Sequence, residues 1–107
     1  MSDDRAIALG TVFVRSQRMV GRRVADEYIL VPIVGRGANL DSIFNLNRVG
    51  AFIWESLDGR QDGHAIVEAL TGRFEVDRLQ AEDDYHAFLA QLLSIQAISP
   101  VDSTAGA

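Results

Sequence analysis

The chain contains no cysteine, no lysine and only two prolines. The absence of cysteine excludes disulfides, thiolate metal sites and a cysteine nucleophile. No apolar run approaches the roughly 20 residues that span a bilayer, and the first five residues lack the basic segment that begins a secretory signal. We therefore expect a cytoplasmic protein that has no membrane partner.

Length and composition predict one globular domain. The 107 residues are 48% hydrophobic and 23% charged, which is enough for a core and excludes wholesale disorder. The net charge of −5 disfavours broad attraction to nucleic acid or to anionic lipid.

The basic residues are unevenly distributed along the chain. All ten are arginine, and four of them fall between positions 15 and 23. This stretch is either a solvated surface or a patch that faces an anionic partner. If it is a patch that faces an anionic partner, Arg22 and Arg23 are the candidates for contact with an acidic peptide or a partner enzyme.

The first half of the chain has the pattern of strands. Residues 28–34 form a continuous apolar run rich in β-branched side chains, and Pro32 would break a helix there. We expect shorter strands at 11–14, 19–24 and 42–46, a turn at 26–27 and a loop at 35–41.

The second half has the pattern of three helices. Apolar residues recur at helical spacing in the stretches 46–57, 66–74 and 81–95. Asn47 and Asp62 are candidate N-caps of the first two helices, and the third is expected to start after Asp77. Gly59 suits a left-handed end to the first helix.

Strands followed by helices favour an α+β fold over an alternating α/β fold. About three N-terminal antiparallel strands followed by three helices resemble, in outline, a small winged helix-turn-helix domain. We divide the chain into an N-terminal segment over 1–18, whose pairing the sequence leaves open, a domain over 19–98 and a disordered tail over 99–107.

The sequence carries no recognisable catalytic constellation. His64 and His86 lie on different expected helices and are not spaced as metal ligands. The Gly35-x-Gly37 pair lacks the helix that follows a phosphate-binding loop. No serine stands in a motif with a histidine and a carboxylate. We therefore expect no enzymatic activity, no metal and no cofactor.

One set of motifs, taken in its order along the chain, is specific enough to support a resemblance to known proteins. Residues 43–59 (IFNLNRVGAFIWESLDG) combine a strand ending in Leu-Asn, a helix with an Ile-Trp pair and a final Asp-Gly. Residues 66–70 and 74–77 follow as a helix and a turn, and residues 84–92 contain Asp-x-x-x-Phe-Leu-x-x-Leu. In this order the motifs resemble the PqqD family over about residues 19–98.

The chain also departs from that family in two places. The family often has a glycine near the end of the third helix, where this chain has Gln96 and Ala97, so we expect a different turn there. The loop at 35–41 is longer than in the pyrroloquinoline quinone members. The resemblance therefore points to the superfamily more than to that pathway.

The resemblance implies a chaperone-like recognition module without catalysis. Such domains bind the leader of a ribosomally made precursor peptide and present it to a modifying enzyme, which is a radical SAM enzyme in pyrroloquinoline quinone biosynthesis. The leader is implied to add as a strand to the sheet edge at 41–46 and to rest against the third helix. An unpaired edge offers main-chain hydrogen bonds, and pockets for alternate side chains give specificity.

The peptide-binding residues implied in this way lie on the edge strand and on one helix. They are Asp41, Ser42, Ile43, Phe44, Asn45, Leu46, Asp84, Tyr85, Phe88, Leu89 and Leu92. Because successive strand residues point to opposite faces, either Ile43 or Phe44 belongs to the core, and the sequence leaves open which.

Two other functions remain open from the sequence. A winged-helix DNA-binding protein fits the outline, but the third helix carries residues Glu82 to Asp84 and no cation after Arg78, which is poor for contact with phosphates. An adaptor subunit that binds only a folded partner protein is the second alternative. A monomer and a homodimer joined through the free sheet edge are both compatible with the sequence.

Overall fold

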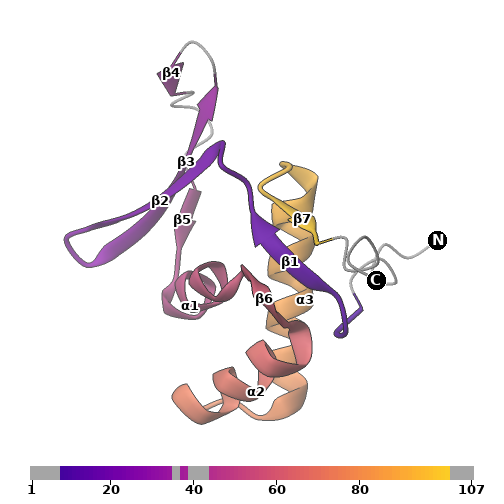
Figure 1. Cartoon of the computed structure of the whole chain (residues 1–107). Helices are drawn as coiled ribbons and strands as arrows, with labels where there is room; N and C mark the ends of the chain where they lie inside the picture. Colours follow the sequence, from indigo (N-terminus) through magenta and orange to yellow (C-terminus); the bar gives the residue numbers. More distant parts are fainter. Residues whose placement is uncertain (1–7, 35–36, 39–43, 102–107) are drawn as a thin grey trace.

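The computed structural model describes residues 8–34, 37–38 and 44–101, and these form an α+β fold (Figure 1). The strands are β1 (Val12–Arg15), β2 (Met19–Val24), β3 (Glu27–Val34), β4 (Gly37–Ala38), β5 (Phe44–Leu46), β6 (Asp58–Asp62) and β7 (Ile98–Pro100). The helices are α1 (Arg48–Ser56), α2 (Gly63–Arg73) and α3 (Arg78–Ser94). The α+β class with antiparallel strands and three helices is confirmed.

The larger sheet is built around β3. β2 pairs with β3 from Met19 to Val24, and β5 pairs antiparallel with the same part of β3. One strand cannot bond two neighbours through the same edge, so β2 and β5 lie on opposite sides of β3. The short β4 pairs with the far end of β3. The β2–β3 turn lies at Ala25 and Asp26, with φ 54° at Ala25, so it begins one residue before the expected turn.

A second sheet joins the strand expected near residues 11–14 to two segments that were not expected to be strands. Its strand order is β6-β1-β7, and both pairings are antiparallel. β1 therefore ties the segment before residue 18 to the domain, and Ser99 and Pro100 belong to a strand instead of the expected tail. The strand β6 (DGRQD) has no apolar alternation, because it is fixed by pairing with β1 and not by a buried face.

All three helices begin at polar caps. Each cap side chain accepts a hydrogen bond from the backbone N–H three residues later, which satisfies a donor that the helix leaves free. The pairs are Asn47 with Gly50 at 2.7 Å, Asp62 with Ala65 at 3.0 Å and Asp77 with Gln80 at 2.8 Å. The expected helix starts are thus confirmed. Gly59 has a left-handed φ of 82°, but it lies within β6 and does not end α1, whose C-cap is Leu57.

The end of α3 forms a Schellman turn even though no glycine is present there. The N–H of Ala97 donates to the carbonyl of Leu92 at 2.8 Å, and the N–H of Gln96 donates to the carbonyl of Leu93 at 3.1 Å. Gln96 takes the left-handed φ of 59° that glycine usually supplies. Our expectation that Gln96 would impose a different kind of turn was therefore wrong.

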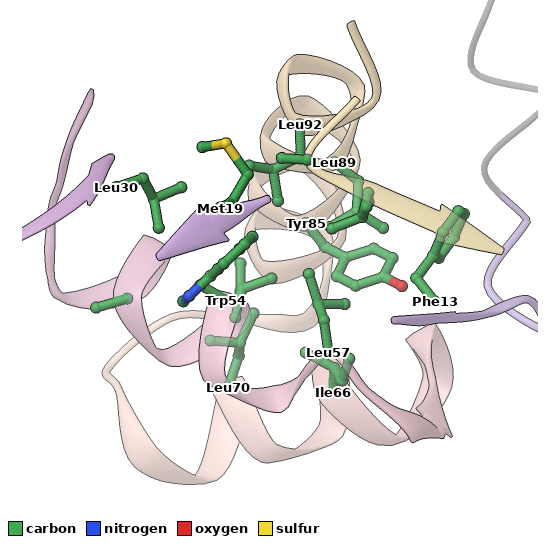
Figure 2. Close-up of a cluster of buried hydrophobic side chains, with 14 of the residues drawn as sticks. Phe13, Met19, Leu30, Trp54, Leu57, Ile66, Leu70, Tyr85, Leu89 and Leu92 are labelled. Carbon is green, nitrogen blue, oxygen red and sulfur yellow. The ribbon is translucent and has the colours of Figure 1, made fainter. Parts of the chain in front are cut away.

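The core lies between the helices and the inner faces of both sheets (Figure 2). Tyr85 and Leu89 point from α3 into this cluster, where Trp54 of α1 is also buried. Gly21 lets β2 approach α1 closely: a Cβ at this position would lie 2.6 Å from both the indole nitrogen of Trp54 and the hydroxyl of Tyr28. The larger sheet is thereby held against α1, with β5 leading directly into that helix.

Candidate functional site

The outer edge of β5 has no strand beside it in the described part of the chain. A free edge presents unpaired N–H and C=O groups that can bond an added strand. The larger sheet has a second free edge on β2, but Arg22 and Arg23 lie on that strand and are exposed. Because charged side chains on an edge strand discourage pairing, β5 is the better template.

A groove of about 450 Å³ runs between β5 and α3. Its walls are mainly apolar on the strand side and mixed on the helix side. The lining residues are Leu30, Phe44, Asn45, Leu46, Phe88, Gln91, Leu92, Ser94 and Ile95. The free edge and the groove are therefore adjacent, as strand addition with side-chain pockets requires.

Register places Phe44 on the helix side of the sheet. Phe44 pairs directly with Leu30, which is fully buried, and directly opposed residues of an antiparallel pair share a face. Phe44 nevertheless keeps 36% of its surface exposed and lines the groove. The other implied edge residues, Asp41, Ser42 and Ile43, lie outside the described residues.

Phe88 stands between the groove and a neighbouring hollow of about 240 Å³. Asp84 lines this hollow together with Asn47 and Gly50 at the start of α1. The Asp84 carboxylate accepts a hydrogen bond from the side-chain amide of Gln80 at 2.9 Å. The two hollows share Phe88 and Gln91, so together they form a path along α3 from Ile95 to Asp84.

Two implied contact residues do not face the groove. Tyr85 and Leu89 have no exposed surface, and both belong to the core cluster. They follow the inner face of α3, whereas Phe88 is rotated by 100° from Leu89 and reaches the groove wall. Leu92 is 2% exposed and forms the floor where core and groove meet.

The sequence did not single out four residues of the groove, namely Leu30 on β3 and Gln91, Ser94 and Ile95 at the end of α3. The last three lie three, six and seven positions after Phe88, which is helical spacing for one broad face. That spacing was the available signal, but the polar character of Gln91 and Ser94 concealed it.

Arg22 and Arg23 are neighbours in sequence but lie on opposite faces of β2. Arg23 pairs with Tyr28, and its guanidinium carbon lies 5.7 Å from the Tyr28 ring centroid. Burial raises the pKa of Tyr28, and the nearby Glu55 carboxylate, which takes part in a hydrogen bond with its hydroxyl, raises it further. Arg23 and Tyr28 line a third hollow, on the other side of α1 from Asp84.

The described residues contain no group of three or more histidine, cysteine, aspartate or glutamate side chains placed to hold a metal ion. Within the same ranges, no helix has the length and apolar character needed to cross a bilayer. The strongly shifted tyrosine, Tyr85, has a pKa raised to about 12, first by burial and then by the charge of Asp62. Its hydroxyl lies in the core, so this shift does not mark a catalytic group.

Comparison with known proteins places this geometry in a family. No match was found among curated protein sequences. The solved structure "TbiB1 in Complex with the TbiA(beta) Leader Peptide" matches with a TM-score of 0.65 and 28% sequence identity, covering 80% of this chain and 94% of that chain. The family model for coenzyme PQQ synthesis protein D (PqqD) matches residues 27–98, from β3 to the start of β7. This match spans well over half of the sequence, and the chain therefore belongs to the PqqD family.

Proposed function

We propose that this chain binds the leader segment of a ribosomally made precursor peptide as an additional strand on β5. The observation that carries the proposal is the position of the free β5 edge directly beside the apolar groove of α3. The edge supplies main-chain hydrogen bonds to any extended peptide, and the groove selects among peptides by their side chains. The similarity to TbiB1, whose structure was solved in complex with a leader peptide, supports this function.

The groove indicates which leader side chains would bind. Phe44, Leu46 and Phe88 provide apolar walls, so alternate residues of the added strand should be large and apolar. Asp84 lies at the far end of the path, where its carboxylate would favour a basic leader residue. The recognised segment is thus an extended stretch with apolar alternation and a cation toward one end.

The second part of the proposal concerns the fate of the bound peptide. A domain without a catalytic constellation acts by holding the peptide, so a separate modifying enzyme would carry out the chemistry. The family suggests a radical SAM enzyme, as in pyrroloquinoline quinone biosynthesis. Presentation of the leader requires that the chain contact this enzyme through a surface other than the β5–α3 groove.

DNA binding has less support from the side chains of α3. Arg78 is the one basic residue of this helix besides His86, and its guanidinium pairs with Glu82 at 3.0 Å and with Glu68 at 3.5 Å. A recognition helix needs free cations for phosphate contacts. The described part of α3 offers acidic residues in their place.

The proposal can be tested by titrating the ¹⁵N-labelled chain with the leader half of the small peptide encoded beside it. We expect amide shifts concentrated in residues 44–46 and along 84–95, with new protection of β5 amides from exchange. A folded protein whose spectrum does not change, or shifts confined to β2, would overturn the proposal.

A paired set of variants gives a quantitative test. Phe88→Ala should weaken leader binding at least tenfold, because it removes the ring shared by both hollows. Phe74→Ala is the matched control, since Phe74 is also partly buried but lines neither of these hollows. Equal loss of affinity in both variants, measured by calorimetry, would show that the effect comes from stability and not from the groove.

A further inference from the structure

A third hollow, of about 640 Å³, lies between the β2–β3 hairpin and the helices α1 and α2. It contains no residue of α3, so its walls are distinct from the helix wall of the leader groove. We call it the arginine hollow. Its lining residues are Arg23, Asp26, Glu27, Tyr28, Asn45, Leu46, Asn47, Arg48, Ala51, Phe52, Glu55, Arg73 and Phe74.

Aromatic rings hold the arginines of this hollow in place. The guanidinium carbon of Arg73 lies 5.4 Å from the Phe52 ring centroid, and that of Arg48 lies 5.9 Å from the Phe74 ring centroid. The two phenylalanine rings contact each other edge to face, with centroids 5.8 Å apart. The result is a compact cluster of two rings and two cations, in which each cation contacts one ring.

Arg48 and Arg73 have no carboxylate within ion-pair distance among the described residues, whereas Arg78 pairs with Glu68 and Glu82. Of the acids lining the arginine hollow, Glu55 is engaged with the Tyr28 hydroxyl, while Asp26 and Glu27 lie at the hairpin. On the helix side, Arg48 and Arg73 outnumber Glu55, and on the hairpin side Asp26 and Glu27 outnumber Arg23. The hollow is therefore net basic on the helices and net acidic on the hairpin.

We propose that the arginine hollow is the docking site for the peptide-modifying enzyme, which would insert a loop carrying a carboxylate between Arg48 and Arg73. This inference rests on the proposed function, because it assumes an enzyme that receives the peptide. Exposed arginines stacked on aromatic rings are enriched at protein interfaces and match a carboxylate by their planar pair of donors. The acidic hairpin at the opposite side would favour a basic residue next to that carboxylate and so fix the direction of the loop.

The location of the hollow explains why the occupant is the enzyme and not the leader. A strand added to β5 faces α3 through Phe88 and Leu92, and neither residue reaches the arginine hollow. The arginine hollow shares Asn45 and Leu46 with the groove and Asn47 with the hollow at Asp84, so the two surfaces meet where β5 leads into α1. Leader and enzyme can thus bind at the same time, with the peptide held beside the docked enzyme.

The test uses the full chain with the modifying enzyme encoded beside it. The variant Arg48→Glu/Arg73→Glu reverses the basic side of the hollow. The control Arg18→Glu/Arg60→Glu makes the same change in net charge at two exposed arginines outside the hollow. Enzyme affinity is measured by biolayer interferometry at two salt concentrations, and leader affinity is measured by calorimetry. Folding of each variant is checked by following Trp54 fluorescence during thermal unfolding.

We expect the hollow variant to bind the enzyme at least tenfold more weakly, to lose its salt dependence and to keep leader affinity within twofold. The control should match the wild type. The inference would be overturned if the hollow variant kept its enzyme affinity or lost its leader affinity. It would also be overturned if the control lost as much enzyme affinity as the hollow variant, or if the wild type did not bind the enzyme. If the hollow variant is unfolded, Arg48→Gln/Arg73→Gln replaces it under the same criteria. Absence of leader binding in the wild type, with enzyme binding that depends on Arg48 and Arg73, would refute the proposed function alone.

Discussion

Replacing Tyr85 with phenylalanine should make the protein more stable. The Tyr85 side chain has no exposed surface, and its hydroxyl has no hydrogen-bond partner among the described residues. An unpaired buried polar group costs about 1–3 kcal/mol of desolvation, and the substitution Tyr85→Phe removes that group while it keeps the ring. We expect the free energy of unfolding at pH 7 to rise by about 1–2 kcal/mol.

The same substitution should alter the stability of the protein at high pH. Burial and Asp62 raise the pKa of Tyr85 to about 12 from its ordinary value near 10, because the folded state disfavours the phenolate. The unfolded chain therefore releases the proton first, and wild-type stability falls as the pH rises from about 10 to 12. A shift of this size corresponds to about 2–3 kcal/mol, which the variant does not lose.

Urea unfolding of both proteins at pH 7, 10 and 11, followed by far-UV circular dichroism, would measure these differences. Tyr28 titrates in both proteins, so its contribution cancels in the comparison. A variant that is less stable than the wild type by 1 kcal/mol or more at pH 7 would refute the reasoning, since the hydroxyl would then have a bonding partner. A difference that stays constant from pH 7 to 11 would refute the assigned pKa.

Three further substitutions test the local structure by denaturant unfolding. Gly21→Ala should cost about 1–3 kcal/mol, because the new methyl group would press on Trp54; unchanged stability would show that β2 can move away. Asn47→Ala should cost about 1 kcal/mol by freeing the Gly50 N–H, whereas Asn47→Asp should retain most of the cap. Gln96→Gly should stabilise the protein by roughly 0.5–1 kcal/mol, since φ is 59° there, and a loss would indicate that the Gln96 side chain has a role of its own.

The part of the fold predicted from sequence is the part set by short-range interactions. Asn47 and Asp62 bond backbone groups only three residues away, so the cap and the helix start are both visible in a short window. The continuous apolar run at 28–34 predicts a buried strand whichever neighbours it pairs with, and it forms β3. The ordered motifs from residue 43 to residue 92 indicated the family for the same reason, since each is a local strand, turn or helix pattern.

The candidate site was predicted in outline but not in detail. The helical spacing predicts that Tyr85, Phe88, Leu89 and Leu92 form one broad apolar face. It does not show which of these side chains are buried in the core and which extend beyond it. That depends on how α3 is rotated against α1 and the sheets, which buries Tyr85 and Leu89 and leaves Phe88 at the groove. A rotation of one residue, 100°, is enough to exchange these roles.

What the sequence determined by itself was the α+β class, the four longer N-terminal strand regions, the three helices with their starts, the family and the absence of cysteine chemistry. Only the tertiary structure decided the β6-β1-β7 sheet and the arginine hollow, each of which joins distant segments. β1 finds its partners more than 40 residues away, and Arg23, Arg48 and Arg73 meet from a hairpin and two helices. Contacts of this kind depend on the packing of the whole chain, because no local pattern distinguishes an arginine over an aromatic ring from one in solvent.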